Sequence, residues 1–209
     1  MTPARKPVNG ARGGDEQPTK ANVDACRRCE LGEVATQGVI GEGPDSARLL
    51  LVGEQPGHEE DLAGRPFVGP AGQLLRGMLE EAGIGAGDIF ITNAVKHFYF
   101  VPRGKRRLHK TPLQRHVAAC HDWLEREIAR VRPDVIVTLG ATALVAVSGT
   151  RLAIAAARNS ALRTASGLPI VATYHPSAVL RAPDDQVRTQ LRGALLADLK
   201  RAARMAARG

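Results

Sequence analysis

The sequence has few cysteines and no long apolar run, and each shortage excludes a class of protein. There are three cysteines, and this odd number does not suit the disulfide framework of a small secreted domain. A membrane-spanning helix needs about 18 or more consecutive apolar residues, and the chain has no such stretch. Residues 1–20 lack the apolar centre of a signal peptide. We therefore expect a cytoplasmic protein without membrane contact.

The chain is long enough to bury one core, and it is strongly basic. It has 209 residues, of which 44% are hydrophobic, and this length fits a single domain. Its formal net charge is +8 at pH 7. Lys and Arg side chains gain free energy when they displace the counterions condensed on nucleic acid, so this charge favours a polyanionic partner.

Apolar runs alternate with helical patterns along the chain. Residues 1–20 carry Gly, Pro and charge without an apolar period, so we expect a flexible tail followed by one domain over 21–209. Short runs rich in Val, Ile or Leu predict buried strands at 48–53, 89–94, 134–140 and 169–174. Helical spacing of apolar residues predicts helices at 70–82 and 112–131, another after Gly140, and a last one at 186–207.

The start of the helix at 112–131 has the composition of a capped N-terminus. Thr111 and Gln114 suit the two ends of a capping box, and Pro112 suits the first helical position. We expect His116 and His121 on the exposed side of this helix, and we assign no role to them or to His58. The apolar stripe predicts a buried face formed by Leu113, Val117, Cys120, Leu124, Ile128 and Val131.

Polar residues gather where the predicted strands end. Strands separated by helices imply a mostly parallel sheet with helices on both faces, and such sheets bind ligands at the carboxyl ends of their strands. The hydrophobic effect alone does not require ionisable side chains there, so we predict a ligand pocket. From the residues alone, Asn93 and the glycines also suit ordinary turn and cap positions. The segments at these ends are GEQPG (53–57), TNAVKH (92–97), LGAT (139–142) and YHPS (174–177).

Three motifs together resemble the uracil-DNA glycosylase superfamily. They are GEQPGHEEDLAGRPFVGPAGQLL at 53–75, TNAVKH at 92–97 and HPS at 175–177. The resemblance covers roughly residues 24–200, and it is greatest to the iron–sulfur branch known as family 4. The segment KRRLH at 105–109 resembles an insertion in the UdgX-type subgroup, whose members bond covalently to DNA at the site of the excised uracil.

The resemblance implies a fold and a set of base contacts. The fold would be a three-layer α/β/α sandwich around a short, mostly parallel, four-stranded sheet. The target deoxyuridine would leave the duplex and enter the pocket, because its glycosidic bond cannot be reached inside the base stack. There Phe67 would stack on uracil, and Asn93 would bind its polar edge, with Gln55 as a further uracil contact. His175 would donate a hydrogen bond to the departing base.

The resemblance also implies a covalent step at His109. A histidine within a run of lysines and arginines is most often a solvated loop residue, but the match to the UdgX-type subgroup makes His109 the expected nucleophile toward C1′ of the deoxyribose. We expect Glu54 to orient the His109 ring or accept its proton. The flanking phosphates would be held by Lys105, Arg106, Arg107 and Lys110.

The cysteines and one histidine form a candidate metal site. Family 4 members hold a [4Fe–4S] cluster on four cysteines, and Cys26, Cys29 and Cys120 match three of these positions. His97 occupies the remaining position, and neutral imidazole is a competent iron ligand. From ligand chemistry alone a Cys3His zinc site fits equally well, and Cys120 by itself suits an ordinary core position. The resemblance favours a [4Fe–4S] cluster that has a structural role.

Three functions are compatible with these features. The first is a uracil-DNA glycosylase for DNA repair that becomes covalently attached to its product through His109. The second is a conventional hydrolytic family 4 enzyme that turns over, and the third is a non-catalytic iron–sulfur module that binds nucleic acid. We prefer the first, with uracil-containing DNA as the partner and single-stranded DNA accepted. We expect a monomer in the bacterial cytoplasm that is associated with the nucleoid when bound to DNA.

Overall fold

The fold is built on a central sheet. The computed structural model describes residues 17–104 and 106–208. Its main sheet has five strands in the order β2-β1-β5-β7-β6. All four predicted strands are confirmed, and β2, β1, β5 and β7 run parallel to one another. The strands span Leu49–Gly53 (β1), Ile89–Asn93 (β2), Val135–Leu139 (β5), Leu162–Arg163 (β6) and Pro169–Thr173 (β7).

The sheet has one strand more than the four that were expected. The additional strand, β6, is antiparallel to β7, with Leu162 opposite Ile170 and Arg163 opposite Pro169. A strand of two residues is too short to show the alternation by which strands are recognised in a sequence. The sheet is nevertheless mostly parallel, as predicted.

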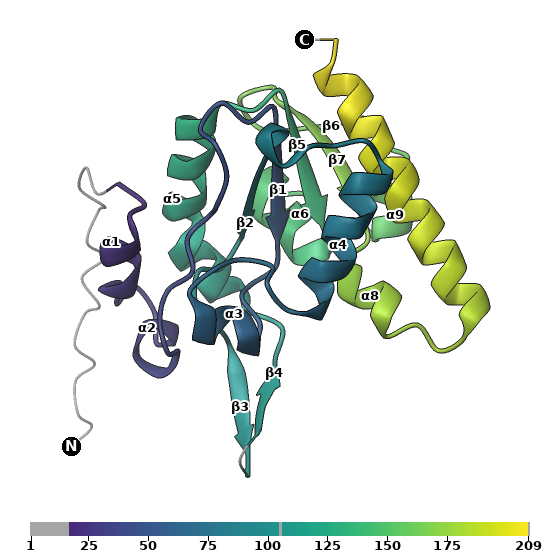
Figure 1. The fold of residues 1–209 in the computed structure, drawn as a ribbon. Coiled ribbons are helices and arrows are strands. Elements are labelled where there is room, and N and C mark those ends of the chain that lie inside the picture. Colours follow the sequence, from purple (N-terminus) through teal and green to yellow (C-terminus); the bar gives the residue numbers. More distant parts are fainter. Residues whose placement is uncertain (1–16, 105, 209) are drawn as a thin grey trace, which may run out of the picture.

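Helices cover both faces of the sheet (Figure 1). In β1, Leu50 and Val52 belong to one apolar cluster with residues of α5, α6 and α7, whereas Leu49 and Leu51 belong to another with residues of α4, α8 and α9. This alternation confirms the predicted α/β/α sandwich. The helices span Lys20–Asp24 (α1), Leu31–Val34 (α2), His58–Ala63 (α3), Pro70–Glu81 (α4), Gln114–Val131 (α5), Ala141–Ser148 (α6), Ile154–Ala157 (α7), Pro176–Leu180 (α8) and Asp185–Ala206 (α9), with a 3-10 turn at Ala86–Asp88 (η1).

The start predicted for the helix at 112–131 is wrong. Leu113 has an extended backbone and is the N-cap of α5, so Pro112 lies before the helix, where it is buried. The residue that reaches back to the cap is His116, whose Nδ1 accepts a hydrogen bond from the Leu113 backbone N–H at 3.2 Å. His116 is fully buried, contrary to the prediction. The Tyr99 ring lies 4.8 Å from its ring, and its Nε2 has a polar partner in Oε1 of Glu30 at 2.8 Å. His121 is exposed, as predicted.

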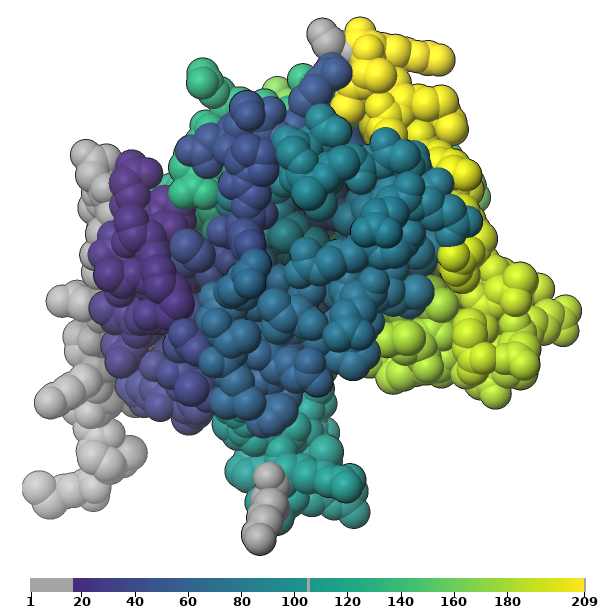
Figure 2. All heavy atoms as spheres, in the orientation of Figure 1, coloured from purple at the N-terminus to yellow at the C-terminus, as the bar shows by residue number. Residues whose placement is uncertain are grey.

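A two-stranded hairpin occupies the region where a basic loop was expected. Phe100–Arg103 (β3) pairs antiparallel with Arg106–His109 (β4). Gly104 at the turn has φ +58°, a conformation that glycine adopts without steric cost. The hairpin projects from the body of the molecule (Figure 1 and Figure 2). His109 is therefore the last residue of a strand, and its position is defined by strand pairing.

A buried ion pair connects the end of β2 to α5. Nζ of Lys96 lies 2.6 Å from Oε2 of Glu127, and both side chains are almost completely buried. The ammonium group also donates to Oγ1 of Thr92 at 2.7 Å and to the carbonyl of Asn93 at 2.9 Å. Oε1 of Glu127 accepts from the Gly41 backbone N–H at 2.8 Å. The pair thus fixes the turn at the carboxyl end of β2.

The predicted tail lies mainly outside the described residues, which begin at Gln17. Thr19 caps α1, because its Oγ1 accepts a hydrogen bond from the Asn22 backbone N–H at 3.3 Å, and the helix starts at Lys20. None of the helices in the described part of the chain combines the length and the apolar character needed to cross a membrane.

Candidate active site

A cavity of about 560 Å³ opens at the carboxyl ends of the parallel strands. It lies where ligands bind in sheets of this kind. The cavity brings together residues from all four predicted polar segments and from the hairpin. The predicted site residues that line it are Glu54, Gln55, Phe67, Asn93, His109, Lys110 and His175.

Phe67 forms one wall of the cavity and has an unusual backbone. Its φ is +54°, which is rare for a bulky residue, yet its side chain is only 5% exposed. A side chain at Gly72 would overlap the Phe67 backbone, so α4 packs directly on it. Nη2 of Arg76 donates to the Phe67 carbonyl at 3.0 Å. Strain of this type is retained where the surrounding structure holds it in place, and here it presents the ring to the cavity.

Gly53 explains how Phe67 and Asn93 approach one another. It is the last residue of β1, and a Cβ added there would overlap Oδ1 of Asn93 and the ring of Phe67. The absent side chain therefore leaves room for an aromatic ring and a carboxamide at the floor of the cavity. Asn93 is 2% exposed, and Lys96 holds its backbone carbonyl. An aromatic face beside a carboxamide suits a flat, polar heterocycle.

His175 is held as a neutral hydrogen-bond donor. Its Nδ1 accepts from the Ser177 backbone N–H at 3.1 Å and lies 2.8 Å from the Ser177 hydroxyl. The ring proton must therefore be on Nε2. Burial, followed by the positive charge of Arg181, lowers the pKa of His175 to about 4. At neutral pH the Nε2–H group can donate to an oxygen on which negative charge develops.

His109 lies at the mouth of the cavity. Its side chain is 46% exposed, and its Nε2 is 3.7 Å from Oε1 of Glu54. Partial burial lowers the pKa of His109, and the charge of Arg181 lowers it further, whereas the charge of Glu54 opposes this shift. The lowered pKa favours the neutral imidazole, which keeps a lone pair that can attack an electrophile.

Gln55 fixes the base of the hairpin. Its Oε1 accepts from the Tyr99 backbone N–H at 3.0 Å. Its Nε2 donates to the carbonyls of Lys110 at 2.9 Å and Tyr99 at 3.2 Å, and it also lies 3.0 Å from Nε2 of His109. An amide nitrogen has two hydrogens, and both are used by these carbonyls. The predicted contact of Gln55 with uracil stays a prediction, whereas its contacts here position the hairpin beside β1.

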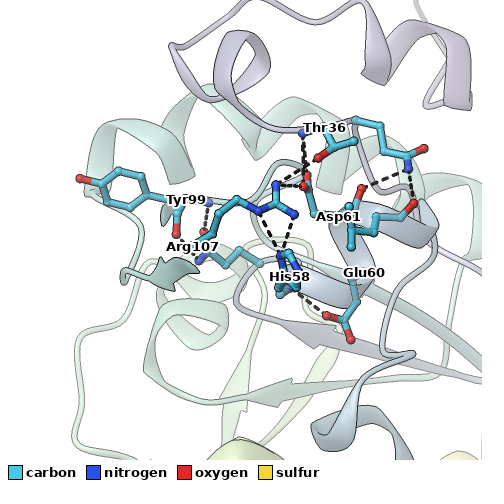
Figure 3. A network of polar contacts seen from close by, with 10 residues as sticks. Thr36, His58, Glu60, Asp61, Tyr99 and Arg107 are labelled. Carbon is cyan, nitrogen blue, oxygen red and sulfur yellow. Dashed lines mark hydrogen bonds and ion pairs between the residues drawn. The ribbon is translucent and has the colours of Figure 1, made fainter. Parts of the chain in front are cut away.

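Arg107 anchors the hairpin to the body (Figure 3). Its Nη1 lies 2.6 Å from Oδ2 of the buried Asp61. Its Nε and Nη2 lie 3.0 and 2.7 Å from Nδ1 of His58, a residue to which the sequence suggested no role. Asp61 also accepts from the Thr36 backbone N–H at 3.0 Å. The guanidinium group lies over the Phe100 ring at 5.1 Å.

The remaining predicted phosphate contacts differ in their surroundings. Lys110 lines the cavity and Arg106 is exposed on β4. Lys105 lies outside the described residues. Arg107 is occupied by Asp61 and His58, so its contact with a phosphate stays a prediction, and its internal contacts identify it as a hairpin anchor.

Glu60 is a structural residue of the site that the sequence analysis missed. Its Oε2 accepts from the Gly57 backbone N–H at 3.0 Å, and its Oε1 accepts from the Gly69 backbone N–H at 2.8 Å. One carboxylate thus holds together the loop after β1 and the loop before α4. Glu60 lies within the motif at 53–75, but nothing local in the sequence indicates these two backbone contacts.

The four candidate metal ligands come from three segments of the chain. Cys26 and Cys29 follow α1, His97 follows β2, and Cys120 lies on α5. Within the described residues, no three His, Cys, Asp or Glu side chains lie close enough to hold a single metal ion. Each ligand of a [4Fe–4S] cluster binds a different iron atom, so a cluster requires ligands that are farther apart.

Two observations support a group between these residues. The buried Nε2 of His97 has no hydrogen-bond partner, whereas a hydrogen bond to the backbone of Val23 engages the ring. Such a bond orients a ligating imidazole. Burial raises the pKa of Cys120 to about 12, and negative charge on Cys29 and Cys26 would raise it further. Cys29 packs against the small apolar cluster that contains Cys120, and a cation bound there would relieve the cost of ionising the thiols.

Comparisons with known proteins agree with this geometry. The model of the uracil DNA glycosylase superfamily matches residues 40–200. A type-4 uracil-DNA glycosylase of Thermotoga maritima is 40% identical over 167 residues, which are 79% of this chain and 83% of that protein. Type-4 enzymes of Pyrobaculum aerophilum and Archaeoglobus fulgidus are 38% and 35% identical over 176 and 168 residues. These matches cover 81% and 77% of this chain, and 86% and 81% of those proteins.

Replacement of Arg181 by Gln should raise the pKa of both His109 and His175. The charge of Arg181 disfavours a second positive charge on either ring. Burial is the main cause of both shifts, so each rise should be below about one unit. An NMR titration of the histidine ring protons measures both values. Arg192→Gln on α9 is the control, because Arg192 pairs with Glu81 and should affect neither ring. Unchanged values in Arg181→Gln would contradict this account of the cavity's electrostatics.

Proposed function

Because the chain belongs to the uracil-DNA glycosylase superfamily, we propose that it excises uracil from DNA and serves in DNA repair. The observation that carries this proposal is the cavity in which Phe67, Asn93 and His175 converge. The proposed partner is uracil-containing DNA, with a single strand accepted because the target base must in any case leave the stack. We also propose that the protein acts as a monomer and meets its substrate in the bacterial cytoplasm.

The chemistry of excision fits the tautomer of His175. Cleavage of the C1′–N1 bond places positive charge on the sugar and negative charge on the uracil oxygens. A donor aimed at one of these oxygens is stronger in the transition state than in the ground state. His175 offers Nε2–H for this purpose, and Phe67 and Asn93 hold the base.

We further propose that His109 captures the sugar. A lone pair of the neutral imidazole forms a bond to C1′ while the C1′–N1 bond breaks and its electron pair leaves with uracil. The proton on the other ring nitrogen is then lost to solvent, with Glu54 as the nearby carboxylate. An oriented group can reach effective molarities of about 10⁵ M or more, so the imidazole can outcompete water.

Two alternative functions remain. In the first, water and not His109 reacts with the sugar. In the second, the protein binds DNA without cleaving any bond. A hydrolytic enzyme is supported by the type-4 relatives that are 35–40% identical to this chain. In that case the basic hairpin only holds phosphates. A non-catalytic iron–sulfur binding module is less well supported, because it leaves the convergence of Glu54, Asn93 and His175 without a purpose.

We propose that Cys26, Cys29, His97 and Cys120 hold the [4Fe–4S] cluster. When bound, the cluster would supply a cross-link between the segment after α1, the turn after β2 and α5. We assign it a structural role, because metal-binding energy at such a site is also folding energy. It would clamp the N-terminal segment beside the hairpin, near the proposed DNA-binding face.

Replacement of His109 by Ala should abolish the covalent complex. Wild-type protein mixed with a uracil-containing oligonucleotide should give a band that resists denaturation on a gel, and mass spectrometry should place the adduct on His109. His109→Ala should give no such band, because it lacks the nucleophilic nitrogen. His109→Ser is expected to admit water and to release free uracil with turnover.

The same experiment distinguishes the alternatives. Wild-type protein that releases uracil repeatedly without an adduct would support the hydrolytic enzyme. A normal adduct yield with His109→Ala would refute the assignment of the nucleophile. Protein that binds DNA without releasing uracil would support the binding module. Asn93→Ala serves as the pocket control, since it should weaken discrimination against cytosine by leaving the uracil edge unpaired.

Protein purified without oxygen should be brown and contain iron and sulfide rather than zinc. Metal analysis and the visible absorption spectrum measure this directly. His97→Cys should keep the iron, because a thiolate replaces an imidazole as ligand, whereas His97→Ala should lose much of it. Stoichiometric zinc without iron in the wild type would contradict the cluster.

A further inference from the structure

The β3–β4 hairpin has two faces of different character. Residues opposite one another in an antiparallel pair point to the same face, and successive pairs alternate between faces. The pairs Phe100–His109 and Pro102–Arg107 share the face on which Arg107 reaches Asp61. The opposite face, which we call the outer face, consists of Val101, Arg103, Arg106 and Leu108.

The outer face is exposed, although half of its residues are aliphatic. Val101 is 40% exposed and Leu108 is 38% exposed, and they form a cross-strand pair. The described part of the chain provides no third strand beside β3 or β4 and no carboxylate in an ion pair with Arg103 or Arg106. Two cations without an ion-pair partner among the described residues therefore lie beside an aliphatic pair, next to the turn of the hairpin that projects from the body (Figure 1).

We propose that the outer face binds the DNA strand that flanks the extruded nucleotide. This inference rests on the proposed function. Guanidinium groups suit phosphates, and the aliphatic pair suits the faces of sugars and bases that are exposed when their neighbour leaves the stack. Arg106 is three residues from His109 along β4, a distance of about 10 Å. That distance corresponds to about three stacked nucleotides at about 3.4 Å each, so the face can follow the strand next to the cavity.

The test uses a uracil-free single-stranded oligonucleotide, so that no covalent step contributes. Val101→Thr with Leu108→Thr places β-branched residues, which suit strands, at both positions but removes most of the aliphatic surface. The affinity, measured by fluorescence anisotropy, should fall about tenfold with an unchanged salt dependence. Arg103→Gln with Arg106→Gln should instead reduce the slope of log K against log salt by about 1.4, because two phosphate contacts are lost.

The matched control is Leu152→Thr with Met205→Thr, since these residues are similarly exposed but lie outside the hairpin. Its affinity should equal that of the wild type. Wild-type affinity in the Val101/Leu108 variant, or an unchanged salt slope in the Arg103/Arg106 variant, would overturn the proposal. The proposed function fails separately, if the wild type neither releases uracil nor forms an adduct. The dependence of DNA affinity on the outer face can hold in either case.

A second and independent observation concerns Thr142. Its Oγ1 donates to Oε2 of Glu54 at 2.6 Å. The other oxygen, Oε1, is the one that lies 3.7 Å from Nε2 of His109. Thr142 is the second residue of α6, whose first residue, Ala141, lines the cavity after the turn at Gly140. A carboxylate at a helix N-terminus is favoured by the helix dipole.

We infer that Thr142 is a positioning residue for Glu54 in the proposed reaction. Its hydroxyl fixes one carboxylate oxygen, so the other faces His109. Without this donor, the carboxylate can rotate away from the imidazole. The LGAT segment, whose polar residue follows β5, thereby receives a role in the site that sequence analysis left open.

Thr142→Val should slow adduct formation at saturating DNA about tenfold or more, whereas Thr142→Ser should restore the wild-type rate. DNA affinity should be the same in all three proteins, and so should the thermal midpoint. Thr138→Val is the control, because Oγ1 of Thr138 is buried without a partner and its loss should not slow the reaction.

A readout independent of the reaction is the ¹⁵N chemical shift of His109 Nε2. This chemical shift should differ from the wild-type value in Thr142→Val and equal it in Thr142→Ser. An unchanged shift and rate in Thr142→Val, or equal losses in Val and Ser variants, would overturn the assignment. If the wild type forms no adduct, the proposed function fails, and the chemical shift still decides whether Thr142 positions Glu54 toward His109.

Discussion

The buried Lys96–Glu127 ion pair is the constraint on which the site depends. Lys96 lies in the chain between Asn93 and His97, so one side chain fixes the turn that separates the proposed base contact from a candidate metal ligand. All three ammonium hydrogens have acceptors in Thr92, Asn93 and Glu127. A buried pair of this kind is seldom more stabilising than apolar packing. Its contribution here is geometric, since it joins β2, α5 and the segment before β1 in one arrangement.

With the strand ends fixed, small residues determine the shape of the cavity. Gly53 leaves space that Phe67 and Asn93 share, and Gly72 allows α4 to press on the Phe67 backbone. Glu60 then holds the two loops on either side of Phe67 through backbone amides. The polar groups of the site are therefore preorganised by close packing and by hydrogen bonds to the main chain, which is the arrangement that electrostatic stabilisation of a transition state requires.

The sequence predicts the parts of the fold that follow a simple period. Buried parallel strands are continuous apolar runs, and their ends locate Glu54, Asn93 and His175 because parallel strands end at one edge of the sheet. The sequence does not predict side-chain contacts between residues that lie far apart in the chain. Arg107 is 46 residues from Asp61, and His116 is 86 residues from Glu30, so neither pairing has a local signal. The sequence does not predict the hairpin because Pro102 and the basic residues that follow it interrupt the pattern of a strand, and it does not predict β6 because β6 has two residues.

The same long-range contacts explain how a basic hairpin holds His109 at the cavity. A two-stranded hairpin alone is at most marginally stable in water. Here Gln55 fixes its base to β1, and Arg107 fixes its middle to α3 through Asp61. Asp61 in turn binds the Thr36 backbone, in the segment that follows Cys26 and Cys29. The position of His109 is therefore coupled to the sheet on one side and to the cysteine-bearing segment on the other. A group bound by those cysteines would therefore affect His109, the proposed nucleophile, by holding this anchor in place.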